Sequence, residues 1–346
     1  MSALTTPVDE PLRDQLGRPM RSLRISLTDR CNLRCHYCMP ESNYDWLPKS
    51  EILSLSDILK IVEAFQKLGV SKLRLTGGEP LLRKDAVAIV EALRQNFPAL
   101  ELAMTTNGTL LAPIAKSLKK AGLNRLTISL DAVDAQQFFK VSRRDLYQNV
   151  QAGLRAASEA QFEQLKLNAV LLDETRRNIR ELISVAQETN AELRFIEYMD
   201  VGGATQWSQE TFLNGQSFRE ELINQFGTLR ELPRPAGDTA QRFQLPSGVV
   251  LGFIESMTNP FCKQCDRSRV TADGVWFHCL YAESGLNLKT WLTQSDESLE
   301  SHIESEWLKR DIQGAYTRKL MGQQGQLYSL EQLRTQPHLE MHTRGG

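Results

Sequence analysis

Six cysteines carry the most informative chemistry of this sequence, and they fall into two groups of three. The first group has the spacing C-x3-C-x2-C and comprises Cys31, Cys35 and Cys38. The second has the spacing C-x2-C-x13-C and comprises Cys262, Cys265 and Cys279. Closed clusters and structural zinc sites usually take four ligands, whereas three thiolates leave one iron of a [4Fe–4S] cluster open to a ligand. The spacing therefore indicates two metal sites that each lack a fourth cysteine.

Disulfides and zinc are the alternatives to clusters. Residues 1–20 contain acidic residues and no apolar h-region, so they predict a polar leader rather than a secretory signal. A reducing compartment favours metal ligation over disulfides. Zinc completed by His36 or by His278 stays open, although His278 adjoins Cys279 and neighbours on an extended strand point to opposite faces.

Composition excludes some classes of partner. The chain has 346 residues, with 41 Lys plus Arg against 42 Asp plus Glu, so its formal net charge is −1. No global basic field indicates nucleic acid, and no apolar run is long enough to span a bilayer. We expect a cytoplasmic protein without nucleic-acid or membrane partners.

The first two hundred residues alternate strand-like and helix-like segments, which predicts a parallel α/β architecture. The clearest helix is 56–68, with Ser56 as N-cap and Gly69 as its stop. The other predicted helices are 84–95, 113–121, 146–159 and 175–188. The predicted strands are 23–28, 72–76, 101–105, 125–130, 165–170 and 193–198.

Polar residues alternate with apolar ones along these strands. In the first strand Arg24, Ser26 and Thr28 share one face, opposite Leu23, Ile25 and Leu27. The same alternation places Arg74, Thr127 and Lys166 on a polar face. Helices on both faces would require nearly continuous apolar strands. The pattern therefore predicts a partial parallel (β/α)6 barrel, with a polar interior wide enough for a ligand, over residues 21–200.

Residues 201–346 form a predicted C-terminal extension that carries the second cysteine group. Loops are expected at Gly202-Gly203 and 232–238, strands at 249–255 and 268–276, and a polar helical region at 289–334. Arg267 and Arg269 would share one strand face, which suits a polyphosphate or, alternatively, a solvated basic strand.

The first cysteine group follows the first strand, and the second strand ends in Gly77-Gly78-Glu79-Pro80. A carboxylate at Glu79 could hold a ligand's ammonium group. The C-x3-C-x2-C motif with GGEP resembles the radical S-adenosylmethionine (SAM) superfamily. That resemblance implies a partial barrel whose three cysteines hold a [4Fe–4S] cluster, and cleavage of SAM to a 5′-deoxyadenosyl radical.

A more specific resemblance covers the chain from about residue 22 to its end. FCKQCDRSRVTADGVWFHC, TTNG, LTISLDA, RFIEYMDVG and the final Gly-Gly are similar to the MoaA family, the GTP 3′,8-cyclases of molybdenum cofactor biosynthesis. The resemblance implies two [4Fe–4S] clusters, with the second facing guanine. It also implies abstraction of the ribose 3′ hydrogen of GTP to give (8S)-3′,8-cyclo-7,8-dihydroguanosine 5′-triphosphate. A cyclic pyranopterin monophosphate synthase would act next, and a homodimer is possible.

Residue by residue, the resemblance implies contacts with SAM and with GTP. The SAM positions are Tyr37, Gly78, Ser129 and Met199. The GTP positions are Arg24, Arg74, Thr105, Lys166, Arg267, Ser268 and Arg269. Two residues depart from the family: Arg344 stands where an aliphatic residue usually precedes Gly-Gly, and Asp266 where Asn is common. The tail enters the active site in this family, so Arg344 bears on how it docks.

Two other functions remain to be separated from the cyclase. A radical enzyme acting on a peptide would share the first cysteine group without needing cations around a triphosphate. A zinc-binding interaction protein would hold zinc and no iron.

Overall fold

The computed structural model describes residues 10–201, 207–235, 237–292, 296–322, 325 and 327–345. Within these residues one sheet has the strand order β12-β11-β10-β1-β2-β3-β4-β5-β6-β9-β8-β7. Its strands are β1 Ser22–Ser26, β2 Lys72–Thr76, β3 Glu101–Thr106, β4 Arg125–Ser129, β5 Gln164–Leu171, β6 Glu192–Glu197, β7 Arg230–Leu232, β8 Gln241–Gln244, β9 Val250–Ile254, β10 Arg267–Val270, β11 Val275–Phe277 and β12 Leu286–Asn287.

The middle of this sheet is the parallel barrel that the alternation predicts. Strands β1 to β6 pair in parallel in chain order, and their bounds lie within two residues of the predicted ones. The parallel sheet is wider than six strands, because β9 adds to β6 and β10 adds to β1. The C-terminal region therefore extends the barrel at both edges, and each edge ends in antiparallel strands.

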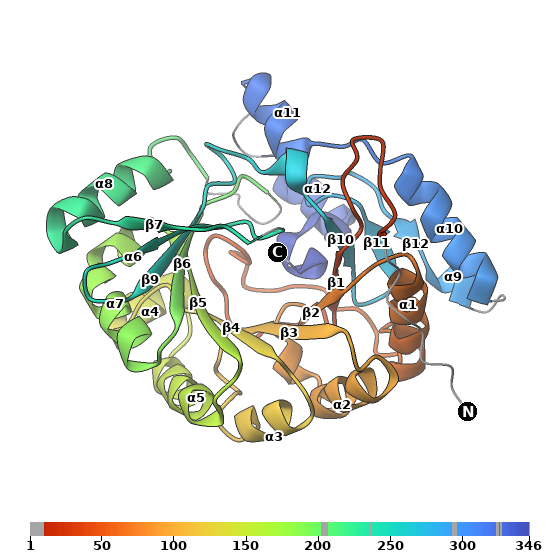
Figure 1. Cartoon of the computed structure of the whole chain (residues 1–346), viewed down its shortest axis with the longest axis horizontal. Helices are drawn as coiled ribbons and strands as arrows, with labels where there is room; N and C mark the ends of the chain where they lie inside the picture. The colour runs from red at the N-terminus through yellow and green to blue at the C-terminus, as the bar shows by residue number, and fades with distance from the viewer. Residues whose placement is uncertain are drawn as a thin grey trace.

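Helices cover the outer face of the curved sheet, as Figure 1 shows. Those of the first part are α1 Leu55–Lys67, α2 Ala86–Asn96, α3 Ala115–Lys120, α4 Ala135–Ser142, α5 Tyr147–Ala160, α6 Asp173–Arg177, α7 Ile179–Glu188 and α8 Gly215–Phe226. Those of the last part are α9 Lys289–Leu292, α10 Asp296–Leu308, α11 Gly314–Leu320 and α12 Leu330–Thr335. Four 3-10 turns are η1 Pro80–Leu82, η2 Cys262–Gln264, η3 Pro337–Leu339 and η4 Met341–Arg344.

Helix α1 shows how local sequence sets these elements. Its N-cap is Ser54 rather than the predicted Ser56, because Ser54 and Asp57 form a reciprocal capping box. Gly69 follows the helix with φ +106°, as a stop requires. The predicted helix 175–188 is instead divided into α6 and α7 at Asn178, and α4 was not predicted.

The core lies between the sheet's outer face and the helices. Apolar strand residues such as Ile25, Leu75 and Ile128 are fully buried in it. The opposite face carries the polar set and turns toward the inside of the arc, where the last residues of the chain also lie (Figure 1).

Part of the predicted leader is buried in the fold, and other predicted segments lie outside the described residues. Residues 1–9, 202–206 and 346, which include the predicted Gly202-Gly203 loop, lie outside the described residues. Within the leader, Asp14, Arg18 and Met20 are buried. Among the described helices, none is long and apolar enough to cross a membrane.

Candidate active site

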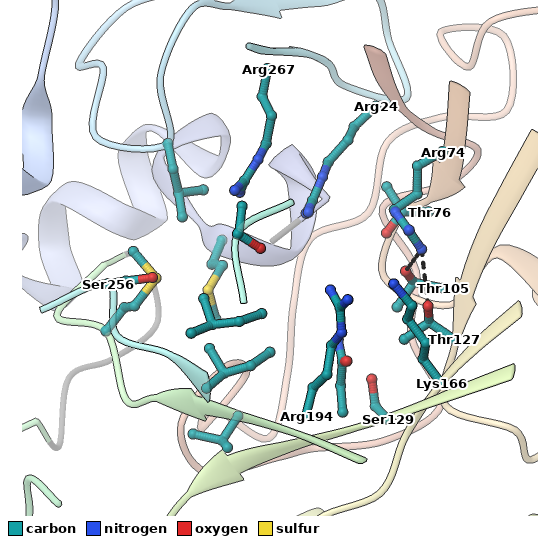
Figure 2. A pocket seen from close by; sticks show the side chains of 18 of the residues that line it. Arg24, Arg74, Thr76, Thr105, Thr127, Ser129, Lys166, Arg194, Ser256 and Arg267 are labelled. Carbon is teal, nitrogen blue, oxygen red and sulfur yellow. Dashed lines mark hydrogen bonds between the residues drawn. The ribbon is translucent and has the colours of Figure 1, made fainter. Parts of the chain in front are cut away.

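A cavity of about 470 Å³ occupies the inner face of the barrel. All six cysteines line it, together with polar residues of β1 to β6 and β10. Figure 2 shows that Arg24, Arg74, Lys166, Arg194 and Arg267 reach into this space from different strands. The fold thus joins two cysteine groups, more than two hundred residues apart, at one site.

The first cysteine group follows β1, at the carboxyl end of a parallel strand, where barrel active sites form. The Cys31 Sγ accepts hydrogen bonds from the Leu33 amide at 3.4 Å and from Asn107 Nδ2 at 3.9 Å. Burial raises the pKa of Cys31 to about 11, and burial also raises the pKa of Cys35 and of Cys38. Such thiols ionise only beside a strong cation, which a metal centre would provide.

Glu79 faces away from the cavity, contrary to the expectation that its carboxylate would hold a ligand's ammonium group. Its side chain is fully buried and does not line the cavity. The carboxylate instead accepts hydrogen bonds from Thr106 Oγ1 at 2.7 Å, the Asn107 amide at 2.7 Å and the Leu81 amide at 3.0 Å. Burial raises the pKa of Glu79 to about 7. Glu79 therefore holds the loop that carries Asn107, rather than presenting a carboxylate to a ligand.

The four positions expected to contact SAM all line the cavity. Tyr37 Oη donates a 2.7 Å hydrogen bond to Asp131, whose other oxygen accepts from the Val170 amide at 2.8 Å. A Cβ at Gly78 would lie 2.4 Å from the Arg30 carbonyl oxygen, so only glycine fits there. Tyr37, Gly78, Ser129 and Met199 thus line the same cavity as the first cysteine group.

Six of the seven positions expected to contact GTP also line the cavity: Arg24, Arg74, Thr105, Lys166, Arg267 and Arg269. Arg267 and Arg269 share the inner face of β10, as their spacing predicts. Ser268 does not line the cavity, because strand alternation turns its side chain outward, where it accepts a hydrogen bond from the Trp276 indole. Its contact with GTP stays a prediction. Arg74 donates to Thr105 at 3.0 Å and to Thr127 at 3.1 Å.

Positive charge dominates this part of the cavity. Burial, followed by neighbouring arginines, lowers the pKa of Arg74 and of Arg269 to about 10. Burial and then Arg194 lower the pKa of Lys166 to about 7. Cations that destabilise one another in this way gain from a bound polyanion.

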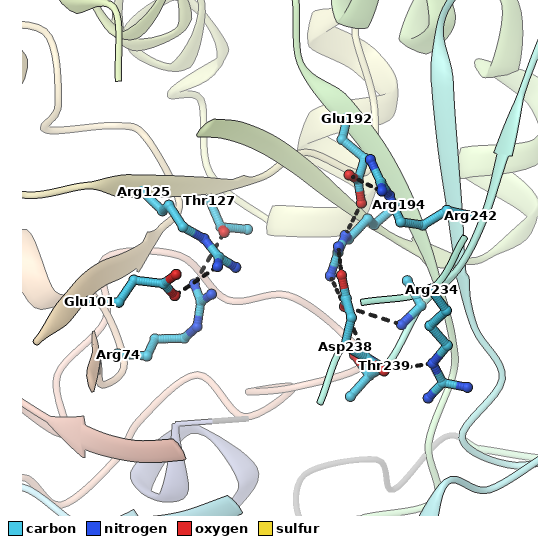
Figure 3. Close-up of polar contacts among 11 residues, drawn as sticks. Arg74, Glu101, Arg125, Thr127, Glu192, Arg194, Arg234, Asp238, Thr239 and Arg242 are labelled. Carbon is cyan, nitrogen blue, oxygen red and sulfur yellow. Dashed lines mark hydrogen bonds and ion pairs between the residues drawn. The ribbon is translucent and has the colours of Figure 1, made fainter. Parts of the chain in front are cut away.

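Several cavity residues were not among the predicted site residues. Figure 3 shows two ion-paired arrangements, one around Arg125 and one around Arg194. Arg125 pairs with Glu101 at 2.7 Å, and Arg194 pairs with Asp238 at 2.7 Å and with Glu192 at 2.5 Å. Burial alone would raise the pKa of Asp238, but Arg194 holds it below its usual value. Strand alternation was the signal that could have identified both arginines.

The second cysteine group lies on η2 and on the segment after β11. The Cys262 thiol accepts backbone hydrogen bonds from Tyr316 and Ala315. Burial alone would raise the pKa of Cys265, but Arg267 and Arg310 lower it. His278 and Cys279 both border the cavity, but the His278 ring packs against Trp276 and Trp307, with centroids 4.3 and 6.3 Å away. The expectation that His278 and Cys279 point to opposite faces stays a prediction.

Neither group is arranged around a single point. In the described part of the chain, no three His, Cys, Asp or Glu side chains are placed to hold one metal ion. A four-iron cluster does not require such convergence, since each thiolate ligates a different iron.

The tail segment, residues 337–345, enters the same space. Ser26 Oγ donates to the Thr343 carbonyl at 2.8 Å, and Arg269 Nη1 donates to the Arg344 and Gly345 carbonyls at 3.0 and 2.9 Å. The Arg344 side chain is buried, donates to the Leu280 and Ala282 carbonyls at 2.7 Å each, and lies 4.0 Å from the Phe277 ring centroid.

Known proteins share the sequence and the fold. Residues 25–186 match the Radical SAM superfamily, and residues 191–316 match Molybdenum Cofactor Synthesis C. GTP 3′,8-cyclase 3 of Mycobacterium bovis is 44% identical over 98% of this chain and 91% of its own length. GTP 3′,8-cyclase 1 of Mycobacterium tuberculosis is 43% identical over 97% of this chain and 95% of its own. The crystal structure of Streptococcus suis SuiB bound to S-adenosylmethionine has a TM-score of 0.61 at 16% identity, covering 87% of this chain and 68% of that one, which shows a shared fold.

Proposed function

The chain belongs to the GTP 3′,8-cyclase family of the radical SAM superfamily, and from this premise we propose which of its residues hold the cofactors and the substrate. It is a radical SAM GTP cyclase of molybdenum cofactor biosynthesis. The observation that carries the assignment of residues is that both cysteine groups and a cluster of buried and half-buried cations line one cavity.

The first cysteine group fits a [4Fe–4S] cluster. Cys31, Cys35 and Cys38 supply three soft thiolate donors on a half-buried loop. Tyr37, Gly78, Ser129 and Met199 border the same region and would hold SAM. When bound, this cluster and SAM supply the 5′-deoxyadenosyl radical that removes the ribose 3′ hydrogen of GTP.

The second cysteine group fits a second cluster. Cys262, Cys265 and Cys279 again offer three thiolates to the cavity, and Arg267 and Arg310 lower the pKa of Cys265 against the effect of burial. This group lines the same cavity as the strand cations, so it would hold the guanine while those cations hold the triphosphate. All six cysteines are free of disulfides, which agrees with a cytoplasmic location.

The strand cations would bind and orient GTP. Arg24, Arg74 and Lys166 project from β1, β2 and β5, and Arg267 and Arg269 from β10. Arginine forks pair with phosphate oxygens from fixed directions, so the ribose would be held in one orientation. The product, (8S)-3′,8-cyclo-7,8-dihydroguanosine 5′-triphosphate, would pass to a cyclic pyranopterin monophosphate synthase. A homodimer stays a prediction.

One experiment tests the substrate and the reaction together. The protein is incubated anaerobically with SAM, a reductant and GTP, and the nucleotide products are separated from GTP by chromatography before their masses are determined. We expect an isomer of GTP together with 5′-deoxyadenosine, and neither from ATP. Equal turnover of ATP, or 5′-deoxyadenosine without a nucleotide product, would contradict the proposal.

A further inference from the structure

Three charged residues are buried directly behind the second cysteine group. Asp14 and Arg18 belong to the leader, and Arg310 follows α10. Asp14 Oδ2 accepts from Arg18 Nε at 2.6 Å and from Arg310 Nη1 at 2.7 Å. The side chains of all three are at most 1% exposed. One carboxylate thus joins two guanidinium groups from opposite ends of the chain.

The same guanidinium groups hold the backbone of each cysteine-bearing segment. Arg18 Nη1 donates to the Cys262 carbonyl at 3.0 Å. Arg310 Nη1 donates to the Cys265 carbonyl at 3.1 Å, and Arg310 Nε donates to the carbonyl of His278, which precedes Cys279, at 3.2 Å. Carbonyl oxygens held in this way fix where the three sulfur atoms lie.

This arrangement has a role apart from substrate binding. Asp14, Arg18 and Arg310 do not line the cavity, so they are not placed to contact a nucleotide bound in it. The Arg310 guanidinium also lies 4.4 Å from the Trp307 ring centroid, which fixes its plane. The group is a rigid support and not a further set of phosphate ligands.

Its charges are not balanced within the group. Two guanidinium groups face one carboxylate, and Arg18 Nη2 has no hydrogen-bond partner among the described residues. An excess buried cation is costly unless an anion lies nearby. A cluster ligated by thiolates is such an anion, and the cysteine loop is the element that these guanidinium groups contact.

We propose that Asp14, Arg18 and Arg310 form an ionic bracket that positions the second cysteine group and stabilises its cluster. They are positioning residues, because they act through the backbone of the loop. The inference rests on the proposed function, in which Cys262, Cys265 and Cys279 hold a cluster.

The test isolates each cluster in the full chain. In one background Cys31, Cys35 and Cys38 are replaced by Ala, so that only the second group remains. In the other, Cys262, Cys265 and Cys279 are replaced by Ala, so that only the first group remains. Arg18→Met and Arg310→Met are made in both backgrounds, and iron and sulfide are counted after anaerobic reconstitution. We expect both variants to bind iron about 10- to 100-fold more weakly where only the second group remains, which is usual when a supporting contact of a metal site is lost. Where only the first group remains, iron content should stay unchanged.

The reduction potential gives a second readout. Arg310→Lys keeps the charge but loses the fork that reaches two carbonyls and Asp14, so it should retain more iron and a potential near that of the parent. Residual cluster in Arg310→Met should have a lower potential, since removing a nearby cation favours the oxidised state. Arg219→Met serves as control, because it breaks a partly buried ion pair with Glu255, and neither residue lines the cavity that the cysteines share.

The outcomes separate this inference from the proposed function. If the background that keeps only the second group binds no iron, the second cluster and the bracket both fail. If it binds iron and the Arg variants bind it equally well at the same potential, the bracket alone is refuted. Loss of iron in both backgrounds would show a general role in folding and would also refute it.

Discussion

The guanidinium group of Arg24 donates a 2.8 Å hydrogen bond to the carbonyl oxygen of Gly345, although the two residues are 321 positions apart. Arg269 donates to the same carbonyl. Both arginines are expected to contact GTP. Backbone carbonyls of the tail segment therefore accept hydrogen bonds from guanidinium groups that would otherwise bind phosphate. Docking of the tail and binding of the triphosphate therefore involve the same two side chains.

Arg344→Ala should release the tail segment. The substitution removes hydrogen bonds to the Leu280 and Ala282 carbonyls and the contact with the Phe277 ring. We expect faster amide hydrogen exchange over residues 339–345 and turnover of GTP lowered about tenfold or more, because small misplacements of groups around a substrate cost rate steeply. Hydrogen exchange and steady-state kinetics measure the two effects.

Arg334→Ala is the matched control for Arg344. The Arg334 side chain is 71% exposed and pairs only with Glu41, at 3.2 Å, among the interactions described. It should leave exchange and turnover unchanged. Unaltered exchange over residues 339–345 in Arg344→Ala would show that this side chain does not anchor the tail.

Lys166 should make GTP binding depend on pH. Burial lowers the pKa of Lys166 from 10.5 to about 7, so in the free protein the amine loses its proton as the pH rises through 7. A bound phosphate favours the ammonium form, so binding takes up a proton above that pH. We expect the Kd for GTP to rise by up to about tenfold per pH unit between about pH 7 and 9. Anaerobic calorimetry in buffers of different ionisation enthalpy measures both affinity and proton uptake.

The pH dependence of folding stability has the opposite sign to that of GTP binding. Between pH 7 and 10.5 the unfolded chain holds more protons at Lys166 than the folded one, so the free protein gains stability from this group as the pH rises. Lys166→Met should bind GTP weakly without the pH dependence, whereas Lys72→Met, at another cavity-lining lysine, should keep it. A pH dependence that persists in Lys166→Met would assign it to another group.

Arg74→Met should weaken nucleotide binding according to the number of phosphates. Arg74 is half-buried and points into the cavity with hydrogen bonds only to the hydroxyls of Thr105 and Thr127 among the contacts described. If it holds a phosphate, the affinity for GTP should fall about 10-fold or more, as for a lost charged hydrogen bond, and that for guanosine should barely change. Competition binding with GTP, GDP, GMP and guanosine checks this. An equal loss for guanosine would place Arg74 at the base or ribose instead.

The polar interior of the barrel was predictable because strand alternation has a fixed period. Arg24, Arg74 and Lys166 were assigned to the polar face, and all three line the cavity. The same rule explains why Arg267 and Arg269 point inward while Ser268 points out. Period-2 patterns report the direction of a side chain but not its partner, so the pairing of Arg194 with Asp238 was not predictable.

Features that depend on long-range packing were not predictable. The burial of Asp14 and Arg18 depends on Arg310, almost three hundred residues away. The orientation of Glu79 depends on donors at Thr106 and Asn107 of another strand end. Local composition made residues 1–20 a polar leader, because nothing near them in sequence shows that these charges have buried partners.

The variants Ser54→Ala and Ser56→Ala test which serine caps helix α1. Ser54 accepts from the Asp57 amide at 3.1 Å, and its own amide donates to Asp57 at 2.9 Å, whereas Ser56 is an exposed residue of the first turn of α1. Loss of the cap should lower the free energy of unfolding by about 1 kcal/mol. Ser56→Ala should change it by less than about 0.5 kcal/mol. Denaturant unfolding measures both losses. If Ser56 were the cap, Ser56→Ala would be the more destabilised of the two variants.

Glu79→Ala distinguishes a structural carboxylate from a ligand-binding one. The substitution leaves three buried hydrogen-bond donors, at Leu81, Thr106 and Asn107, without their acceptor. The free energy of unfolding should therefore fall by about 3 kcal/mol. Asn107 also donates to Cys31 Sγ and to Asn32 at 2.9 Å, so iron binding by the first cysteine group should weaken with it. A carboxylate that held the ammonium group of SAM would give the opposite pattern, with unchanged stability and iron and a raised Kd for SAM. Glu91→Ala, on the exposed side of α2, controls for loss of a carboxylate as such and should change none of the three measurements.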